Sequence, residues 1–575
     1  MLDTVIRGGT LIDGSGAERR EADVGIRDGR IEAVGEISEA ARAEIDAGGH
    51  IVAPGFVDIH THYDAQAFWD STLSPSPFHG VTTVVGGNCG FSIAPLAPGA
   101  GEYLMKMLSR VEGMPLESLR EGVPWDWTSF SEYLDRLEGK LAVNAGFMVG
   151  HSALRRSVMG EAASGGAAST EDVAAMQALL AESLAGGGLG FSSSWARTHN
   201  DGAGKPVPSR AADRDEILAL CRTTGEFPGT SLEFIPTIGP FAEEHCEIMA
   251  EMSLAAGRAL NWNVLVAQTM GREIWEGQLA ASDYATERGA RVLALTPPLV
   301  MEVRLNFVSG FVLDAFPGWA DLFGLPLDER KKRLADPSER ERLDASANSE
   351  EAGVFRALAQ WENISIAETF SESTKRFEGR RIGEIAEETG KKPFDAMLDI
   401  VLEDDLRTSL QPASYGHDDE SWKIREEIWR DPRSVIGASD AGAHLDMINT
   451  FVYTTALLEA VRERGLLSLE EAVHQLTQVP AELYGLHERG RLAEGFCADV
   501  TIFDADRVAP TPLYTRHDLP AGASRLYADA IGVENVLVNG CEIVRGGEAT
   551  GASPGTILRS GRDTETVGIP GRAST

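Results

Sequence analysis

The stretch GFVDIHTHYDAQAFWD, from Gly55 to Asp70, places two histidines one residue apart at the end of a short apolar run. Such a run is typical of a buried strand. Side chains at positions i and i+2 of a strand point to the same side, so His60 and His62 project together. Two imidazole nitrogens placed in this way can bind one metal ion. We therefore interpret His60 and His62 as candidate metal ligands at the end of a strand.

Seven more apolar or β-rich runs follow this strand, and amphipathic segments such as EDVAAMQALLAESLAGG lie between several of them. The eight runs are GFVDIHTH, GVTTVVGG, NAGFMVGHS, GLGFSSS, GTSLEFIPT, RALNWNVLV, ARVLALTP and RSVIGASD. Strands that alternate with helices are typical of a parallel α/β fold, and eight such units predict a closed TIM (β/α)8 barrel. Barrel enzymes carry their active sites at the carboxyl ends of the strands. The two histidines lie at such an end.

The two ends of the chain carry short alternating strands with glycine turns, such as IRDGRI and VENVLVNGCEIVRGG. We predict one small β-sandwich domain built from residues 1–53 and 481–558, and a barrel over residues 54–480. A barrel of this kind needs about 250 residues, so the middle must contain insertions. The largest, about 299–432, is expected to cover the active site like a lid. Residues 559–575 are polar and glycine-rich and are predicted to be a flexible tail.

The composition limits the partners. The chain has 88 acidic and 52 basic side chains and a net charge of −36, which repels nucleic-acid phosphates and anionic lipids. We therefore expect a small-molecule substrate, no nucleic acid and no membrane, and we leave a homo-oligomer open. Five cysteines at irregular spacings disfavour a disulfide framework. No secretory leader and no run approaching ~18 apolar residues is evident, so we expect a cytoplasmic protein.

Longer motifs around the two histidines resemble a known family. The stretch IVAPGFVDIHTHYD, the β-rich segment before it and the closing GRLAEGFCADVTIFD resemble the amidohydrolase superfamily of metal-dependent hydrolases. The motifs GVTTVVGGNCGFSIAPLAP, VGHSALRRSVMG, IGASDAG and VENVLVNGCEIVRGGEATGASPGTILR are similar to its N-acyl-D-amino-acid deacylase (D-aminoacylase) branch. The resemblance spans nearly the whole chain, apart from an unfamiliar central third.

This resemblance implies a site of four residues. In that branch the two histidines bind a metal, a cysteine after the second strand is a ligand that can bridge two ions, and an aspartate ending the eighth strand is the base. The matching residues here are His60, His62, Cys89 and Asp440. A thiolate is a soft ligand that suits Zn²⁺, and a carboxylate can take a proton from metal-bound water. The structural alternatives are a small buried hydrophobe for Cys89 and a helix N-cap for Asp440.

The chain departs from the branch at strands five and six. The related deacylases carry a further metal-binding histidine near the end of each, whereas GTSLEFIPT and ALNWNVLVAQ contain none. Nearby amides such as Asn261 and Asn263 are poor zinc ligands, so Glu233 is the plausible substitute.

Three arrangements follow from this departure. In the first, His60, His62, Cys89 and Asp440 hold one ion, and water completes the coordination or displaces one ligand, which suits a catalytic site. In the second, the site recruits Glu233, His151 or His199 as a replacement ligand. In the third, the metal is lost and the protein only binds a small ligand. We expect Zn²⁺ or another divalent metal, and one ion rather than two.

Three residues near the predicted mouth are further candidates. His151 ends the third strand and is assigned a role in binding substrate or supporting the metal ligands, against simple packing. His444, four residues after Asp440, would orient that carboxylate if a helix begins there. Arg155 is a candidate for binding a substrate carboxylate, because a guanidinium pairs with one through two hydrogen bonds. Solvated surface arginines are nevertheless commoner.

The predicted function is that of a metal-dependent amidohydrolase, which cleaves a carbon–nitrogen bond other than a peptide bond with metal-activated water. The resemblance favours an N-acyl amino acid as substrate, and it alone favours the D-enantiomer. Another amide, a cyclic amide or a carbamate is the alternative substrate. A catalytically inactive, metal-free barrel that binds a small molecule is the non-enzymatic alternative, because a fold does not establish a reaction.

Overall fold

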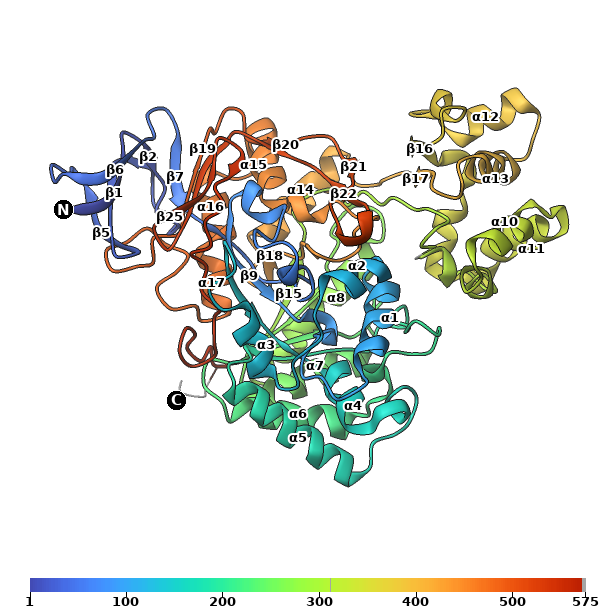
Figure 1. Ribbon diagram of the computed structural model, residues 1–575, viewed down its shortest axis with the longest axis horizontal. Coiled ribbons are helices and arrows are strands. Elements are labelled where there is room, and N and C mark those ends of the chain that lie inside the picture. The colour runs from blue at the N-terminus through green and yellow to red at the C-terminus, as the bar shows by residue number, and fades with distance from the viewer. Residues whose placement is uncertain (311, 571–575) are drawn as a thin grey trace.

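The computed structural model describes residues 1–310 and 312–570, and it places sheets from the two chain ends on one side of a central α/β body (Figure 1). The body is built on parallel strands that pair in the order β8–β9–β10 and β11–β12–β13–β14–β15–β18. The strands are β8 (Phe56–Asp58), β9 (Val81–Gly86), β10 (Asn144–Phe147), β11 (Val149–Gly150), β12 (Gly190–Ser194), β13 (Ser231–Ile235), β14 (Leu260–Trp262), β15 (Val292–Thr296) and β18 (Ser434–Ile436).

The two runs of strands join at both ends. Only Met148 separates β10 from β11, and its N–H donates to the carbonyl of Gly86 in β9. A parallel bridge between Thr61 and Ala441 brings the segment after β18 beside the segment after β8. The segments that follow the first and the last strand of the body are therefore neighbours. All residues of these strands are buried, as expected of parallel strands covered on both faces.

Helices alternate with these strands and cover them. Their starts are encoded locally: Ser169 and Asp213, for example, cap α5 and α6 by accepting a hydrogen bond from a backbone N–H three residues on. The helices of the body are α1 (Gly101–Val111), α2 (Leu116–Gly122), α3 (Phe130–Leu137), α4 (His151–Met159), α5 (Thr170–Ala185), α6 (Arg214–Gly225), α7 (Glu243–Ala256), α8 (Arg272–Thr286), α14 (Asp419–Trp429), α15 (Tyr453–Arg464), α16 (Leu469–Leu476) and α17 (Gln478–Leu483).

Strands from both chain ends form two sheets that share one apolar core. One sheet has the order β5–β4–β1–β6 and the other β26–β25–β24–β19–β7–β2–β3. Val24 and Val52 from the first part of the chain pack there with Val500 and Leu537 from the last. The strands are β1 (Leu2–Arg7), β2 (Thr10–Leu11), β3 (Arg20–Glu21), β4 (Asp23–Arg27), β5 (Arg30–Gly35), β6 (Ala41–Asp46), β7 (Ile51–Pro54), β19 (Val500–Phe503), β24 (Val533–Val538), β25 (Cys541–Arg545) and β26 (Glu548–Ala549).

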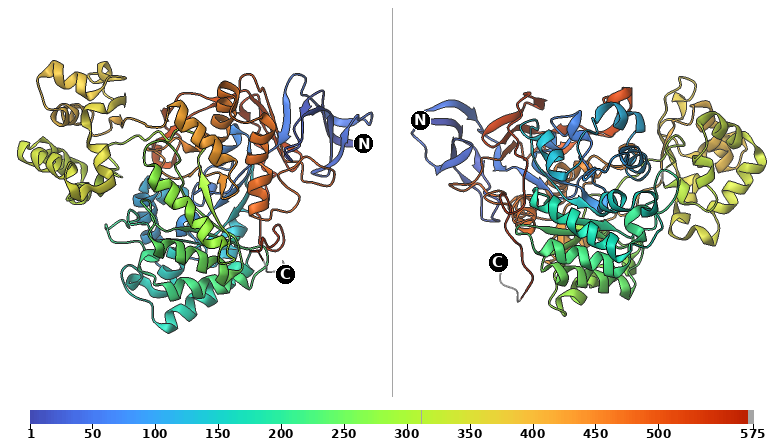
Figure 2. Two further views of the ribbon diagram at one scale, coloured as in Figure 1. Left: turned by 180° about the vertical axis from the view of Figure 1, so that it is seen from behind. Right: turned by 60° about the horizontal axis from the view of Figure 1, so that its bottom comes forward.

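A helical lobe projects from the body on the side away from the N-terminus (Figures 1 and 2). Its core is separate and aromatic, with Trp319, Trp361 and Phe394 at its centre. Its elements are α9 (Ala320–Phe323), α10 (Leu327–Ala335), α11 (Pro337–Ala347), β16 (Ser365–Glu368), α12 (Ile382–Thr389), α13 (Pro393–Glu403) and β17 (Ser409–Gln411). The backbone bridge Val303–Ile448 joins the start of the lobe to the body, and the bridge Leu305–Leu410 ties the two ends of the lobe together.

Two predicted boundaries need correction. Helix α14 lies inside the predicted insertion at 299–432, yet Trp422 and Trp429 bury its apolar face in the core of the body, so the separate lobe is shorter. Residues 559–570 were predicted as part of a flexible tail but pack on the body. Thr564 is buried, its hydroxyl donates to the carbonyl of Gly229 at 2.6 Å, and Glu565 N–H donates to Gly485. Residues 571–575 lie outside the described part of the chain.

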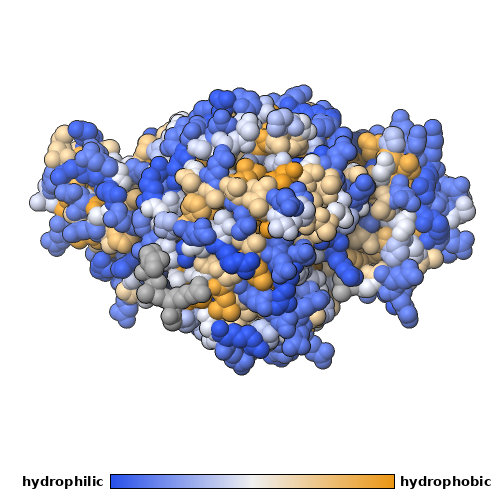
Figure 3. Space-filling view, turned by 90° about the horizontal axis from the view of Figure 1, so that it is seen from below, coloured by the Kyte–Doolittle hydropathy of each residue, from blue (hydrophilic) through white to orange (hydrophobic). Residues whose placement is uncertain are grey.

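The face of the molecule shown in Figure 3 is mostly hydrophilic, with apolar areas over the body. The remaining strands pair in a segment near the C-terminal end. Within residues 1–310 and 312–570, no helix combines the length and apolarity needed to cross a membrane. The paired strands of this segment are β20 (Ala509–Pro510) with β23 (Ala530–Ile531) and β21 (Tyr514–Arg516) with β22 (Arg525–Tyr527).

A buried ion pair joins the terminal sheets to the body. Asp499, next to β19, pairs with the buried Arg489, accepts a hydrogen bond from the Asn144 side chain of β10 at 3.1 Å, and accepts another from Asn539 N–H at 2.8 Å. One carboxylate therefore connects both parts of the fold.

We predict that Asp499→Ala destabilises the protein by about 3–5 kcal/mol, because it leaves the charge of Arg489 buried and unpaired. Urea unfolding measures this loss. Asp506→Ala, which removes an exposed carboxylate from the same region, is the control and should change stability by less than about 0.5 kcal/mol. Equal effects of the two substitutions would contradict the prediction.

Candidate metal centre

The four residues predicted as ligands all lie at carboxyl ends of strands in the body. His60 and His62 follow β8 and are buried. Cys89 lies in the short turn η3 (Asn88–Gly90) after β9, and Asp440 follows β18. Cys89 and Asp440 have φ angles of 57° and 49°, a left-handed conformation that is uncommon for residues other than glycine. Such backbone strain is concentrated at functional sites.

The donor atoms of these residues converge. Cys89 Sγ lies 3.4 Å from His60 Nε2 and 3.6 Å from His62 Nε2. One ligand atom from each of these three residues lies within 4.8 Å of the other two. Asp440 Oδ1 is 3.1 Å from His60 Nε2 and 3.7 Å from His62 Nε2. The structure therefore brings together the four residues that the sequence motifs suggested.

These separations fit a metal ion. Zinc binds nitrogen and oxygen at about 2.0–2.2 Å and sulfur at about 2.3 Å, so two tetrahedral ligands lie about 3.3–3.6 Å apart. The pairs measured here span 3.1–3.7 Å. The donor set of two imidazoles, a thiolate and a carboxylate suits zinc in its chemistry as well.

The charge of the surroundings also fits a cation. Four carboxyl groups are buried around the donor atoms, those of Asp58, Asp64, Glu112 and Glu233. Neither these four carboxyl groups nor that of Asp440 forms an ion pair with a lysine or arginine among the described residues. Glu112 and Asp440 pair with histidines instead. Buried charges in proteins are paired or coordinate metals. Burial raises the pKa of Asp58 and of Asp64 to about 7, and a divalent ion nearby would favour their charged forms.

Burial and neighbouring charges shift the pKa values of the site in opposite directions. Burial raises the pKa of Glu233 to about 8. Burial would also raise the pKa of Asp440, but hydrogen bonds to His60 and His62 hold it well below its ordinary value. Burial opposes protonation of His62, yet the charge of Glu112 and the hydrogen bond to Asp440 outweigh it and raise the pKa to about 9. A metal must displace this proton, because only a neutral imidazole binds it.

The ends of strands five and six carry Glu233 and Asn263. Glu233 Oε2 accepts a hydrogen bond from Cys89 N–H at 2.7 Å, while Oε1 is buried without a hydrogen-bond partner. Asn263 Nδ2 lies 3.3 Å from both His60 Nε2 and Asp440 Oδ1. Glu233 thus holds the backbone of the cysteine, and the amide of Asn263 donates to the carboxylate. Neither belongs to the group of converging donor atoms.

His151 and Arg155 are placed differently from the predicted roles. The ring nitrogens of His151 lie 2.8 Å from Ser193 Oγ and 2.8 Å from Glu216 Oε1. Arg155 is fully buried, pairs with Glu216 and donates to the carbonyl of Gly166 at 2.6 Å. Because these polar groups are engaged inside the protein, the structure favours packing over substrate or metal binding for both residues.

His199 and His444 lie near the metal centre without joining it. His199 Nδ1 is 2.8 Å from Ser194 Oγ, and burial, with the charges of His444 and His62, lowers its pKa to about 3. The helix expected at His444 does not form, since residues 442–447 are turns and bends. His444 therefore faces Glu112, with Nε2 3.9 Å from its carboxylate, instead of orienting Asp440.

Sequence reasoning missed Glu112. It follows α1, is 2% exposed, and its Oε1 lies 3.7 Å from His62 Nδ1. Glu112 belongs to none of the motifs and stands 50 positions from His62, so the sequence alone holds no signal for it. Its burial and its position beside a ligand are visible only in the fold.

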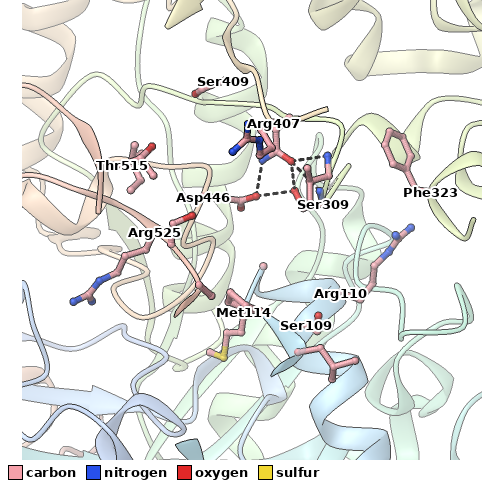
Figure 4. A pocket seen from close by; sticks show the side chains of 18 of the residues that line it. Ser109, Arg110, Met114, Ser309, Phe323, Arg407, Ser409, Asp446, Thr515 and Arg525 are labelled. Atoms are coloured by element: carbon pink, nitrogen blue, oxygen red, sulfur yellow. Dashed lines mark hydrogen bonds between the residues drawn. The ribbon is translucent and has the colours of Figure 1, made fainter. Parts of the chain in front are cut away.

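A cavity of about 690 Å³ lies beside the metal centre, between the lobe and the body. Figure 4 shows Ser109 and Met114 on one wall and Arg407 and Ser409 on the opposite one. Gly113, which follows Glu112, also borders the cavity, as does Asp446, two residues after His444. None of the four candidate ligands lines the cavity itself.

The cavity is lined with cations although the chain is strongly acidic. Its basic residues outnumber its acidic ones, and they are Lys106, Arg110, Arg330, Arg407 and Arg525. Arg407 is exposed, its guanidinium stacks on Phe370, and it forms no ion pair with any described carboxylate. The others bind carboxylates or backbone carbonyls.

The chain is similar over nearly its whole length to known proteins. A model of the amidohydrolase family matches residues 43–544. D-aminoacylase of Alcaligenes xylosoxydans xylosoxydans is 32% identical over 567 residues, which cover 97% of each chain. N-acyl-D-glutamate deacylase of the same organism is 31% identical, covering 99% of this chain and 98% of the relative.

A solved structure is also similar. It is N-acyl-D-glutamate deacylase from Bordetella bronchiseptica, complexed with zinc and a phosphonate inhibitor that mimics the tetrahedral intermediate. It is 27% identical with a TM-score of 0.65, and the match covers 97% of this chain and all of that one. The predicted resemblance is confirmed: this protein belongs to the amidohydrolase family of metal-dependent hydrolases that act on carbon–nitrogen bonds.

Proposed function

We propose that the protein hydrolyses N-acyl amino acids, with a preference for the D-enantiomer. The observation that carries the proposal is the convergence of donor atoms from His60, His62 and Cys89. Asp440 Oδ1 lies within 3.1–3.7 Å of the two histidines. This convergence occurs in a chain 31–32% identical to D-aminoacylase and to N-acyl-D-aspartate and N-acyl-D-glutamate deacylases over nearly its whole length.

We further propose that the body is a TIM (β/α)8 barrel, in line with the parallel strand order and the bridge between Thr61 and Ala441. The proposed domains are a composite β-sandwich of residues 1–53 and 481–558 and a barrel over 54–480 whose lobe acts as a lid. A cytoplasmic location remains part of the proposal.

The proposed cofactor is one Zn²⁺ ion held by His60, His62, Cys89 and Asp440. The separations and the donor chemistry support this ligand set. One related D-aminoacylase structure is described in terms of a binuclear centre, with activation by one metal and attenuation by a second. A single ion suits this chain, because strands five and six supply Glu233 and Asn263 in place of further strong zinc ligands.

The residues of the site divide the work of hydrolysis. A divalent ion held by these residues would polarise the amide carbonyl and lower the pKa of the attacking water to about 7. Asp440 takes a proton from the attacking water and passes it to the leaving nitrogen. Asn263 donates a hydrogen bond to Asp440 and holds its carboxylate in place. Glu233 fixes the backbone of Cys89 and so the direction of the thiolate.

We predict that Asp440→Asn lowers kcat by about 10²–10⁴-fold, because the base is removed. Protein purified without chelator is assayed on N-acyl-D- and N-acyl-L-amino acids and on cyclic amides, with elemental analysis of bound metal. Asp419→Asn changes a side chain that is 94% exposed and serves as the control. Full activity of Asp440→Asn with metal bound would refute the assignment of the base. Absence of metal and of turnover in the wild type would favour a ligand-binding protein instead.

We predict that Cys89→Ser weakens zinc binding by more than about 100-fold, because a thiolate ligand is lost. Substitutions of residues that only support the ligands weaken it by about 10–100-fold. Competition with a chelator of known affinity measures the change. Cys221→Ser is a matched control, since Cys221 is equally buried but lies in α6, away from the donor atoms. If both variants bind zinc alike, Cys89 only packs.

We predict that Arg407→Glu raises KM for an N-acyl amino acid about 2–10-fold, because the cationic cavity attracts the substrate carboxylate. The effect should shrink at 1 M salt, where charges are screened beyond about 3 Å, and should vanish for the neutral methyl ester. Arg376→Glu reverses a charge elsewhere in the lobe, outside the cavity lining, and is the control. An equal effect of both substitutions would rule out a local role of the cavity.

A further inference from the structure

The carboxylate of Glu112 lies between two histidines of the site. Its Oε1 is 3.7 Å from His62 Nδ1 and its Oε2 is 3.9 Å from His444 Nε2. The residue is buried, and it forms no ion pair with lysine or arginine in the described part of the chain. Removing a carboxylate from water is costly, so this position requires a compensating interaction.

His62 presents its two ring nitrogens to different partners. Nε2 faces Cys89 Sγ at 3.6 Å and Asp440 Oδ1 at 3.7 Å. Nδ1 is buried and has no hydrogen-bond partner. A histidine that binds a metal through one nitrogen generally donates the other N–H to a carboxylate or carbonyl, which fixes its tautomer. Glu112 is the carboxylate on that side of the ring.

The backbone holds Glu112 firmly in place. Its N–H donates to Leu108 in the last turn of α1 at 2.9 Å, and its carbonyl accepts from His444 N–H at 2.5 Å. Gly113, with φ of +62°, then packs so closely that a Cβ there would lie 3.2 Å from Asp446 Oδ1 and 3.4 Å from His444 Cα. The backbone of Glu112 is thus fixed against the turn that follows Asp440, and its side chain brings Oε1 to 3.7 Å from His62 Nδ1, just beyond hydrogen-bond distance.

We propose that Glu112 is a positioning residue for the metal ligand His62. It accepts a hydrogen bond from the Nδ1–H group of His62, leaves Nε2 free to face the other donor atoms, and adds negative charge that strengthens cation binding. The proposal rests on the proposed function only in requiring a metal at the site. It differs from a purely structural role, in which Glu112 would stabilise the fold whether or not metal is bound.

The test is the zinc affinity of metal-free protein, measured by chelator competition for the wild type, Glu112→Gln and Glu112→Ala. We expect a loss of about 10–100-fold for Glu112→Ala and a smaller loss for Glu112→Gln, which retains an acceptor oxygen. Glu102→Gln on the exposed face of the same helix is the control and should leave affinity unchanged. Thermal unfolding with and without zinc should show a smaller zinc-induced rise in Tm for the variants, with no fall in Tm of the metal-free protein.

Zinc affinity within twofold of the wild type for Glu112→Ala would overturn the proposal. An equal fall in Tm of the metal-free and zinc-loaded forms would overturn it too, since that is the mark of a structural role. Glu112→Gln has nearly the size of glutamate and keeps the test usable if the alanine variant does not fold. The readout is independent of turnover: a wild type that binds zinc but hydrolyses no N-acyl amino acid refutes the proposed function and leaves this inference open to the affinity measurement.

Discussion

The site depends on the contact between the segment after the first strand of the body and the segment after the last. Asp440 N–H donates to the carbonyl of His60 at 3.2 Å, Ser439 Oγ donates to the same oxygen at 3.0 Å, and His62 N–H donates to Ala441 at 2.8 Å. These bonds join positions almost 380 residues apart in sequence. Backbone pairing, and not contact between the ligand side chains, thus sets the distance between the histidines and the carboxylate.

A second constraint is electrostatic. The centre gathers five carboxyl groups and a thiol in a buried volume, and the described counter-charges are imidazoles alone. Charging these groups inside the protein is costly, and burial accordingly raises the pKa of Asp58 and Asp64 to about 7 and that of Glu233 to about 8. A bound cation would offset this cost, so metal binding and folding would be coupled through the same groups. The left-handed backbone at Cys89 and Asp440 adds to the strain that the surrounding structure must hold.

The features that short sequence motifs encode could be predicted from the sequence. His60, His62, Cys89 and Asp440 each follow an apolar strand, so local pattern and resemblance located them, and the same strands predicted the parallel order of the body. Contacts between residues far apart in the sequence could not be predicted, because they depend on the three-dimensional fold. Glu112 has no motif, the helix assumed at His444 is a turn, and Arg155 faces a buried glutamate contributed by another helix. The polar composition of residues 559–575 predicted a flexible tail, yet backbone hydrogen bonds to the body hold the described part of this segment in place.

The turn that carries Asp440 also anchors the lobe. Seven residues beyond Asp440, Met447 accepts a hydrogen bond from Arg304 N–H at 2.7 Å, and Ile448 forms a bridge with Val303 at the start of the lobe. Between these positions, the N–H of His444 donates a hydrogen bond to the carbonyl of Glu112. The carboxylate of Asp446 accepts one from the side-chain amide of Asn306 in the lobe at 2.7 Å. The segment after Asp440 is therefore bonded both to the lobe and to the residue beside His62, so the placement of the lobe and the placement of the candidate metal centre depend on the same stretch of backbone.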